Sequence, residues 1–372
     1  MSFWRAPHLP LFLLASVWAA LVPLVWLWPG FTCDPVAWHR QELVLGFAGA
    51  AMGGYLLSAL PHWLKVKAAG REGAALSPRG TMALVLAWII GRLAGGACQP
   101  DGLALAGLAL YPLGLALSLV VPVLRARVWR RLPIALAPLL LLLIGLRLRL
   151  ASDSLTAVLG MALLVALIGG RIVPAFLLAR TGDRSGRSAM PLGARLADGA
   201  LAVALLLHLL NASEAWVGGV ALAAALGQAL RMKDWALAPA LQGHGDLALL
   251  VLAWLWLPPG LGLLGSGLTG AVALPLATLA HALTMGLMGS MVMAVMARAW
   301  MGRAPGRLVA GRATIAAFAI LQLATIARLT LSEAGPAVVL PWVVAWVLVA
   351  AQSARAATRP LPHPVFSARR SG

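Results

Sequence analysis

The chain has 372 residues, of which 61% are hydrophobic and only 11% are charged, with a mean hydropathy of +0.90. A soluble domain carries about 25% charged residues, so this composition excludes an ordinary soluble protein and indicates one whose main partner is the lipid bilayer. The formal net charge of +18 does not indicate nucleic acid binding, because the basic residues fall in short segments between apolar runs, as membrane topology places them.

Twelve apolar runs are long enough to cross a bilayer, since roughly 20 helical residues span its hydrocarbon core. We therefore predict an all-α polytopic membrane protein with about twelve transmembrane helices. The first run is not followed by a clear cleavage site, so we interpret it as a retained helix. The runs cover residues 10–28, 42–60, 81–98, 102–124, 132–150, 154–178, 196–211, 213–230, 234–257, 268–297, 309–329 and 336–354.

The positive charge alternates between successive connections. The segments after runs two, four, six, eight and ten and the C-terminal tail carry most of the lysines and arginines, whereas the other connections hold Arg40, Arg147, Arg149 and Arg328. Because positively charged loops stay in the cytoplasm, this pattern places both termini there. We expect residues 1–355 to form a single transmembrane helical domain and residues 356–372 to form a disordered, basic cytoplasmic tail.

Several histidines lie in or beside the apolar runs, where lipid offers no hydrogen-bond partner to a polar side chain. His281 lies deep in the tenth run, and the topology places it in the outer half of the membrane with His39 and His208 at similar depth. His39 and Glu42 are three residues apart and share a helical face. One interpretation is a metal centre, with Glu42 as a further ligand or a hydrogen-bond acceptor. The other is that these histidines are interfacial or structural residues.

Two further intramembrane charges admit more than one role. Arg171 in the sixth run has three open interpretations: a pair with a carboxylate, a side chain that reaches the cytoplasmic surface, or a contact with an anionic group such as a haem propionate. Asp246 follows His244 in the sequence GHGD. We favour a cytoplasmic loop at this point, with the ninth span starting later, near Leu247, because the flanking glycines are typical of turns; the alternative is a buried proton-carrying group.

The remaining histidines and the cysteines are less informative. His8, His62 and His363 are expected at the surface or among lipid headgroups. Cys33 and Cys98 are expected on the outer side, where they either pair in an oxidising compartment or are two unrelated small residues.

Three stretches in this order resemble the NnrS family of bacterial membrane proteins. They are WHRQELVLGFAGAAMGGYLLSALPHW (38–63), IGGRIVPAF (168–176) and LAHALTMGLMGSMVMAVMARAWMGRAPGR (279–307). The resemblance covers most of the chain. It implies a protein of the bacterial inner membrane that contains haem and copper and acts in nitric oxide metabolism or resistance to nitrosative stress. Turnover of nitric oxide, sensing of it and protection of other metal centres are open alternatives.

The resemblance also assigns candidate site residues. His39 and Glu42 match the first histidine and the glutamate of the family's WHxHE motif, and His281 matches the histidine of the tenth span. Arg171 matches the arginine of the GGR motif. His39 and His281 are therefore the metal ligands that the resemblance implies.

This sequence departs from the family pattern at two places. Gln41 stands where the family has a second histidine, and an amide is no substitute for imidazole as a strong haem or copper ligand, which puts the copper site in doubt. The family histidine before a Trp-Leu-Pro stretch is replaced by Val251, and His244 lies two turns earlier. His244 and His208 are thus weaker metal candidates.

Three other functions were considered. A secondary transporter fits twelve spans, and residues 182–188 (GDRSGRS) resemble a loop signature of major-facilitator proteins, although here the loop follows span six. A subunit like that of a terminal oxidase needs more histidines inside the membrane than this chain offers. A helical scaffold without a cofactor would tolerate replacement of every histidine. The oligomeric state is left open.

Overall fold

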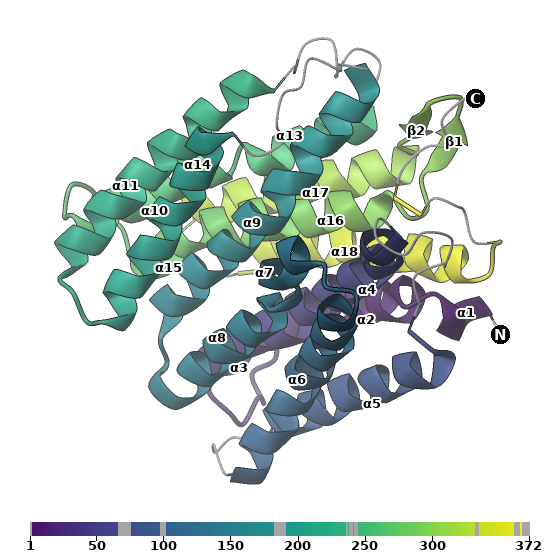
Figure 1. The fold of residues 1–372 in the computed structure, drawn as a ribbon. Helices are drawn as coiled ribbons and strands as arrows, with labels where there is room; N and C mark the ends of the chain where they lie inside the picture. The colour runs from purple at the N-terminus through teal and green to yellow at the C-terminus, as the bar shows by residue number, and fades with distance from the viewer. Residues whose placement is uncertain are drawn as a thin grey trace. The chain divides into compact units, whose positions relative to one another are not determined.

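The computed structural model describes residues 2–65, 76–96, 102–181, 191–235, 237, 241, 245–331, 335–360 and 365–366. Helices make up nearly all of this part of the chain (Figure 1). Ten of them are long and apolar enough to cross a membrane, so the protein is an all-α, multi-pass membrane protein, as predicted. They are His8–Leu27, Pro35–Leu64, Gly102–Arg125, Trp129–Ala151, Ser154–Ala179, Leu192–Leu209, Gly245–Leu268, Leu276–Ala297, Arg312–Thr330 and Pro336–Ala357.

The third and eighth expected spans are also helices. They form α5 (Pro78–Gly95) and α11 (Glu214–Arg231), each of 18 residues. Helix α5 packs along α6 (Gly102–Arg125), and α11 packs against α10 (Leu192–Leu209) and α14 (Leu257–Leu268). Each of the two helices carries a buried arginine, Arg92 in α5 and Arg231 in α11.

The ninth span differs from the prediction at its end. The apolar run covers residues 234–257, and the favoured later start near Leu247 agrees with α13, which begins at Gly245 and ends at Trp254. The span does not end at residue 257, because α14 extends it to Leu268. The two prolines of the sequence WLWLPPG lie in the first turn of α14, where the missing N–H groups would have no intrahelical partner in any case.

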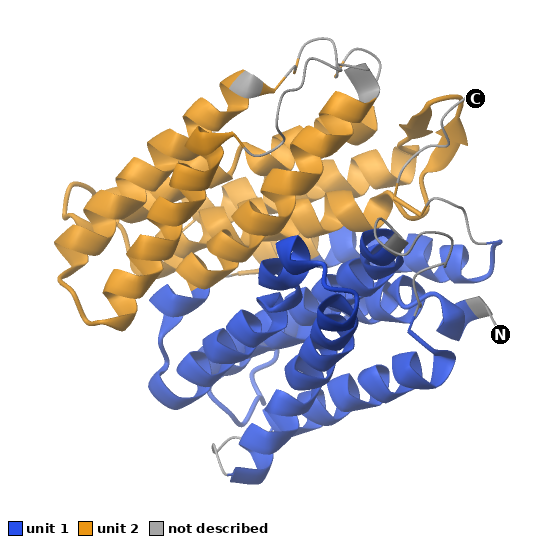
Figure 2. Ribbon diagram, in the orientation of Figure 1, with its two compact units in different colours: residues 1–157, 343–362 blue, residues 158–342, 363–372 orange. Residues whose placement is uncertain are grey.

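The chain divides into two compact units (Figure 2). Unit 1 comprises residues 1–157 and 343–362. In it α2 packs against α4, and α6 packs against both α5 and α8. Besides α5 and α6 its elements are α1 (Ser2–Arg5), α2 (His8–Leu21), η1 (Val22–Leu27), α3 (Pro35–Gln41), η2 (Glu42–Ala48), α4 (Gly49–Lys65), η3 (Trp129–Arg131), α7 (Leu132–Ala135) and α8 (Ala137–Ala151).

Unit 2 comprises residues 158–342 and 363–372, so that α9 (Ser154–Thr181) and α18 (Pro336–Ala357) each cross the boundary between the units. In unit 2 α13 packs against α16, and α17 packs against α15 and α16. The elements not yet named are η4 (Met232–Asp234), α15 (Leu276–His281), η5 (Ala282–Gly289), α16 (Ser290–Ala297), β1 (Gly302–Ala304), β2 (Arg307–Val309) and α17 (Arg312–Thr330). Strands β1 and β2 form an antiparallel hairpin whose turn contains Pro305 and Gly306, with Gly306 at a φ of 66°.

Two long helices contain a π-helical segment. The span that begins with α3 widens into η2 before it continues as α4, and the span that begins with α15 widens into η5 before α16. π-helical segments are rare and occur often at functional sites. Here they start at Glu42 and directly after His281, two of the candidate site residues.

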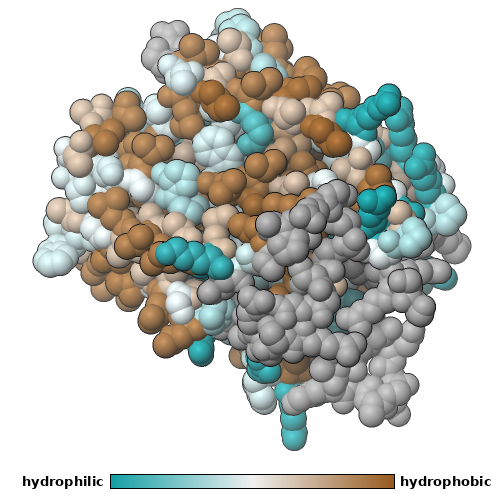
Figure 3. Space-filling view, turned by 90° about the horizontal axis from the view of Figure 1, so that it is seen from above, coloured by the Kyte–Doolittle hydropathy of each residue, from teal (hydrophilic) through white to brown (hydrophobic). Residues whose placement is uncertain are grey.

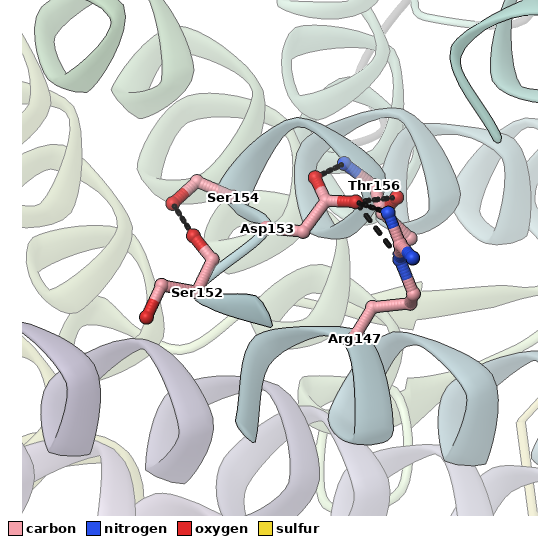
Figure 4. Close-up of polar contacts among 5 residues, drawn as sticks. All are labelled: Arg147, Ser152, Asp153, Ser154 and Thr156. Atoms are coloured by element: carbon pink, nitrogen blue, oxygen red, sulfur yellow. Dashed lines mark hydrogen bonds and ion pairs between the residues drawn. The ribbon is translucent and has the colours of Figure 1, made fainter. Parts of the chain in front are cut away.

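The connection between α8 and α9 is held by Asp153 (Figure 4). Its carboxylate accepts hydrogen bonds from the backbone N–H and the hydroxyl of Thr156, at 2.9 and 2.7 Å, and so caps the start of α9. The Arg147 guanidinium donates to the same carboxylate at 3.0 and 2.8 Å from α8. Ser152 ends α8 in the left-handed conformation, with a φ of 52°. A short, closely bonded turn therefore joins two membrane-spanning helices.

The surface of the helices is apolar. Large hydrophobic side chains such as Leu93, Leu103 and Trp216 are more than two thirds exposed, and Figure 3 shows apolar residues over much of the face that it presents. So many exposed large apolar side chains are unusual for a soluble protein. They are compatible with contact between the helices and lipid.

Candidate functional site: buried ion pairs and an oriented histidine

Three carboxylates are buried in the described part of the chain, and each of them is paired. Glu42 pairs with Arg92, Asp198 with Arg231, and Asp246 with Arg298, at 2.6, 3.0 and 2.8 Å. Each arginine also lies over an aromatic ring, those of Trp88, Trp254 and Phe176. A buried charge is tolerated only when it is paired and hydrogen-bonded. These carboxylates therefore neutralise buried arginines between the helices.

Glu42 is the centre of a cluster in unit 1. It is fully buried, and its Oε2 accepts hydrogen bonds from Arg92 Nη1 at 2.6 Å and from the Trp18 indole at 2.8 Å. Its Oε1 accepts from Gln41 Nε2 at 3.3 Å. Gly95 of α5 makes room for it, because a Cβ at that position would collide with Oε1. Glu42 is thus a hydrogen-bond acceptor between α2, α5 and η2.

His39 lies on α3, half-buried. The indole N–H of Trp26 points to His39 Nδ1 at 3.3 Å, with the two ring centroids 5.5 Å apart. An indole nitrogen only donates, so Nδ1 of His39 acts as the acceptor in this contact. In a neutral imidazole the proton then lies on Nε2.

Asp198 and Arg231 form a second polar cluster, in unit 2. Oδ1 of Asp198 accepts from Gln228 Nε2 at 2.9 Å and from Arg231 Nη1 at 3.0 Å. Arg231 Nη2 also donates to the Gly170 carbonyl of α9 at 2.6 Å. Arg171, the next residue of α9, is half-buried and close enough to act electrostatically on both Asp198 and Arg231. Among the described residues, the cluster brings together the guanidinium groups of Arg171 and Arg231 and the carboxylate of Asp198.

The expectation that Asp246 lies in a loop was wrong. Asp246 lies in the first turn of α13, is only 4% exposed, and binds Arg298. Pairing with a buried cation, together with the favourable position of an acidic side chain at a helix N-terminus, outweighs the turn preference of the neighbouring glycines. Arg298 Nε also donates to the carbonyl of Phe366 in the C-terminal tail, at 2.9 Å. His244 lies outside the described residues.

His281 is the last residue of α15 and directly precedes η5. Its Nδ1 contacts the carbonyl oxygen of Ala277, one turn earlier. A carbonyl oxygen can only accept, so Nδ1 carries the proton and the lone pair of the neutral ring lies on Nε2. This tautomer is the opposite of the one at His39.

The described residues do not assemble a cluster of metal ligands. Within that part of the chain, no three His, Cys, Asp or Glu side chains are placed to hold one metal ion. His281, Arg171 and His208 belong to unit 2, on α15, α9 and the last turn of α10. His39 and Glu42 belong to unit 1. The convergence of His39 and His281 stays a prediction.

Two smaller expectations can be compared with the structure. His62 is exposed, as expected, but His8 is only 3% exposed, and its Nδ1 lies 3.1 Å from the Ser58 hydroxyl. The expectation that His8 lies at the surface was wrong, because a serine of α4 offers its ring a partner inside the unit. Cys33 is disulfide-bonded; Cys98, the other cysteine of the chain, and His363 lie outside the described residues.

A comparison with protein-family models identifies the relatives of this chain. The model of the NnrS protein family matches residues 2–360, nearly the whole length. The chain belongs to the NnrS family. Searches of curated proteins and of solved structures return no match. In this NnrS protein the three stretches that carried the resemblance include α3 with η2, the middle of α9, and η5 with α16.

Our reading of the sequence missed Arg92, Asp198 and Arg231. Each is a charged residue in or next to an apolar run, which is a signal that it needs a buried partner. Arg92 lies within the third expected run and Asp198 within the seventh. Their partners are on other helices, so the sequence indicates that a pair is needed but not which residues form it.

Proposed function

We propose that this NnrS protein is a haem protein of the bacterial inner membrane, that it acts in nitric oxide metabolism or nitrosative-stress resistance, and that His281 Nε2 is a ligand of the haem iron. The observation that carries the proposal is the contact between His281 Nδ1 and the Ala277 carbonyl. Histidines that bind metals commonly donate the other ring N–H to a backbone carbonyl or a carboxylate, which fixes the tautomer and the ring orientation.

His39, the second proposed ligand, needs a rearrangement. In its contact with Trp26 the Nδ1 lone pair is used, and Nε2 of the neutral ring carries a proton. To bind iron through Nε2, the ring must move this proton to Nδ1 and give up the hydrogen bond from Trp26. We therefore expect His281 to contribute more than His39 to the affinity for haem.

Haem suits these residues better than a copper site built from protein ligands alone. A protein copper site needs several ligands gathered at one point, whereas a haem group would bring most of the iron ligands itself and would need only one or two from the protein. Arg171 fits the same proposal. Its guanidinium can donate two parallel hydrogen bonds to a carboxylate such as a haem propionate.

Nitric oxide is small and apolar, so it dissolves in the lipid that surrounds the helices. When bound, haem would supply iron, a metal that coordinates small diatomic molecules such as nitric oxide. The contribution of the chain is to orient the His281 imidazole and to keep the surroundings apolar. Leu279, Ala282 and Leu283, the neighbours of His281 along the chain, are apolar and buried.

The test is the absorption spectrum of the detergent-purified protein together with its haem-to-protein ratio. We expect a Soret band in the wild type, its loss in H281A and its weakening in H39A. H62A is the control, because it removes an exposed histidine that is not a metal candidate, and it should keep the band. A wild-type protein without bound haem that instead drives substrate uptake into proteoliposomes would contradict the proposal and indicate a transporter.

A further inference from the structure

Two helices of the protein share a pattern, one in each unit. They are the helix formed by α3, η2 and α4 and the helix formed by α15, η5 and α16. One constant shift in residue number aligns the two helices. It places Glu42, the first residue of η2, on Ala282, the first residue of η5, and it also brings identical residues into line. The aligned pairs are Pro35 with Pro275, Ala37 with Ala277, Leu43 with Leu283, Gly46 with Gly286, and Gly49 with Gly289.

A tryptophan indole also packs against each π-helical segment, at the same aligned glycine. Trp18 of α2 lies on Gly46 in unit 1, and Trp256, directly before α14, lies on Gly286 in unit 2. A Cβ added to either glycine would lie 2.5 Å from an atom of the indole. No real Cβ tolerates that distance, so in both segments the indole lies against the bare backbone of a glycine.

The two indoles are anchored through their N–H groups. Trp256 Nε1 donates to Gln322 Oε1 of α17 at 2.7 Å, and Gln322 Nε2 donates to the Ser290 hydroxyl at 2.8 Å. Ser290 is fully buried and is the first residue after η5. In unit 1 Trp18 donates directly to Glu42, the first residue of η2. Each tryptophan is thus linked to one end of its π-helical segment, directly in the case of Trp18 and through Gln322 in the case of Trp256.

This arrangement bears on His281 because of where η5 begins. The backbone changes from i→i−4 to i→i−5 pairing directly after His281. The orientation of the imidazole relative to the carbonyl of the preceding turn depends on the residue at which that change occurs. A contact that fixes the π-helical segment therefore also fixes the contact between His281 Nδ1 and Ala277.

We propose that Trp256, seated on Gly286 and bonded through Gln322 to Ser290, is the positioning residue that keeps His281 Nδ1 on the Ala277 carbonyl. The identity of the ligand at Nε2 rests on the function proposed above. The positioning itself is a property of the protein alone, because every contact in it joins residues of unit 2.

The test measures the tautomer of His281 by nitrogen NMR. Full-length protein labelled with 15N-histidine is produced in cells that do not make haem, and the His281 signals are assigned by their loss in H281Q. We expect the wild type to show one neutral tautomer, with the proton on Nδ1. In W256A the π-helical segment loses its contact, and we expect both tautomers to appear.

Trp18 provides the matched control. W18A removes the corresponding indole from the other unit, and it should leave the nitrogen signals of His281 as they are in the wild type. A monodisperse W256A protein with unchanged His281 signals would overturn the proposal. If W256A does not fold, Q322L decides, because it keeps the indole on Gly286 and removes the link to Ser290. Mixed tautomers in Q322L support the proposal, and wild-type signals overturn it.

Haem affinity gives a second readout. Loss of a residue that orients a metal-binding histidine lowers metal affinity by about 10–100-fold, so we expect W256A and Q322L to bind haem that much more weakly, with W18A affected less. If the wild type binds no haem at all, the proposed function is wrong while the NMR result still decides the role of Trp256. If haem binds equally well to W256A, W18A and the wild type, Trp256 is not a positioning residue.

Discussion

At the residue scale, the three buried carboxylates of the described chain each pair with an arginine from another helix. Arg92 of α5 forms an ion pair with Glu42 of η2, and the guanidinium of Arg92 lies over the ring of Trp88. The same combination of carboxylate, arginine and ring recurs at Asp198 and Asp246. The pairs hold helices together, but their net contribution to stability is small, because desolvation offsets most of the Coulomb attraction.

Breaking the pair in unit 1 tests this view. R92L leaves the fully buried Glu42 without its counter-charge, and we expect it to lower the free energy of unfolding by about 3–5 kcal/mol. The double variant E42L/R92L removes both charges and should be less destabilised than the sum of the two single variants. Unfolding of the four proteins in mixed detergent micelles measures the coupling.

Arg79 offers the control for that series. It is exposed in the first turn of α5, and R79L should stay close to the wild type. Equal destabilisation by R79L and R92L, or strict additivity in the double variant, would mean that the Glu42–Arg92 pair has no special role.

At the scale of elements, the helices were predictable where the signal is local. An apolar run of roughly 20 residues indicates a membrane-spanning helix without knowledge of its neighbours, and ten of the expected spans overlap helices of that kind. The extension of the ninth span to Leu268, the ion pair of Asp246 and the π-helical segments η2 and η5 were missed. They depend on tertiary contacts, such as Arg298 on Asp246 and Trp256 on Gly286.

The turn between α8 and α9 gives a prediction at this scale. Asp153 both caps α9 and binds Arg147, so D153A removes two stabilising contacts at once. Loss of an N-cap costs about 0.5–2 kcal/mol, and we expect D153A to lie at the upper end of that range in thermal unfolding. S154A is the control, since Ser154 makes only a long hydrogen bond, of 3.4 Å, to the Ser152 carbonyl. If D153A and S154A unfold at similar temperatures, Asp153 does not stabilise the turn as a cap and ion-pair partner.

At the scale of the whole molecule, the candidate site could be predicted only in part. The sequence pointed to His281, Glu42 and Arg171 because polar groups in apolar runs are conspicuous. It could not show that Glu42 is engaged by Arg92 and Trp18, or that the rings of His39 and His281 have opposite tautomers. Those facts depend on which side chains meet once the helices pack.

The orientation in the membrane is a prediction of the charge pattern. With both termini in the cytoplasm, green fluorescent protein fused after residue 360 should be fluorescent, and alkaline phosphatase fused there should be inactive. Alkaline phosphatase fused after residue 30, between the first two spans, should be active. The reverse pattern of activities would show that the alternation of arginines does not set the topology.

The central claim is that the imidazole of His281 binds haem iron, and chemical rescue tests it most directly. H281G removes the ring and leaves a space that free imidazole can enter, so titration of H281G with haem should show a weak Soret band that imidazole strengthens toward that of the wild type. H39G treated in the same way should respond less. If H281G binds haem as the wild type does and ignores imidazole, His281 is not the ligand.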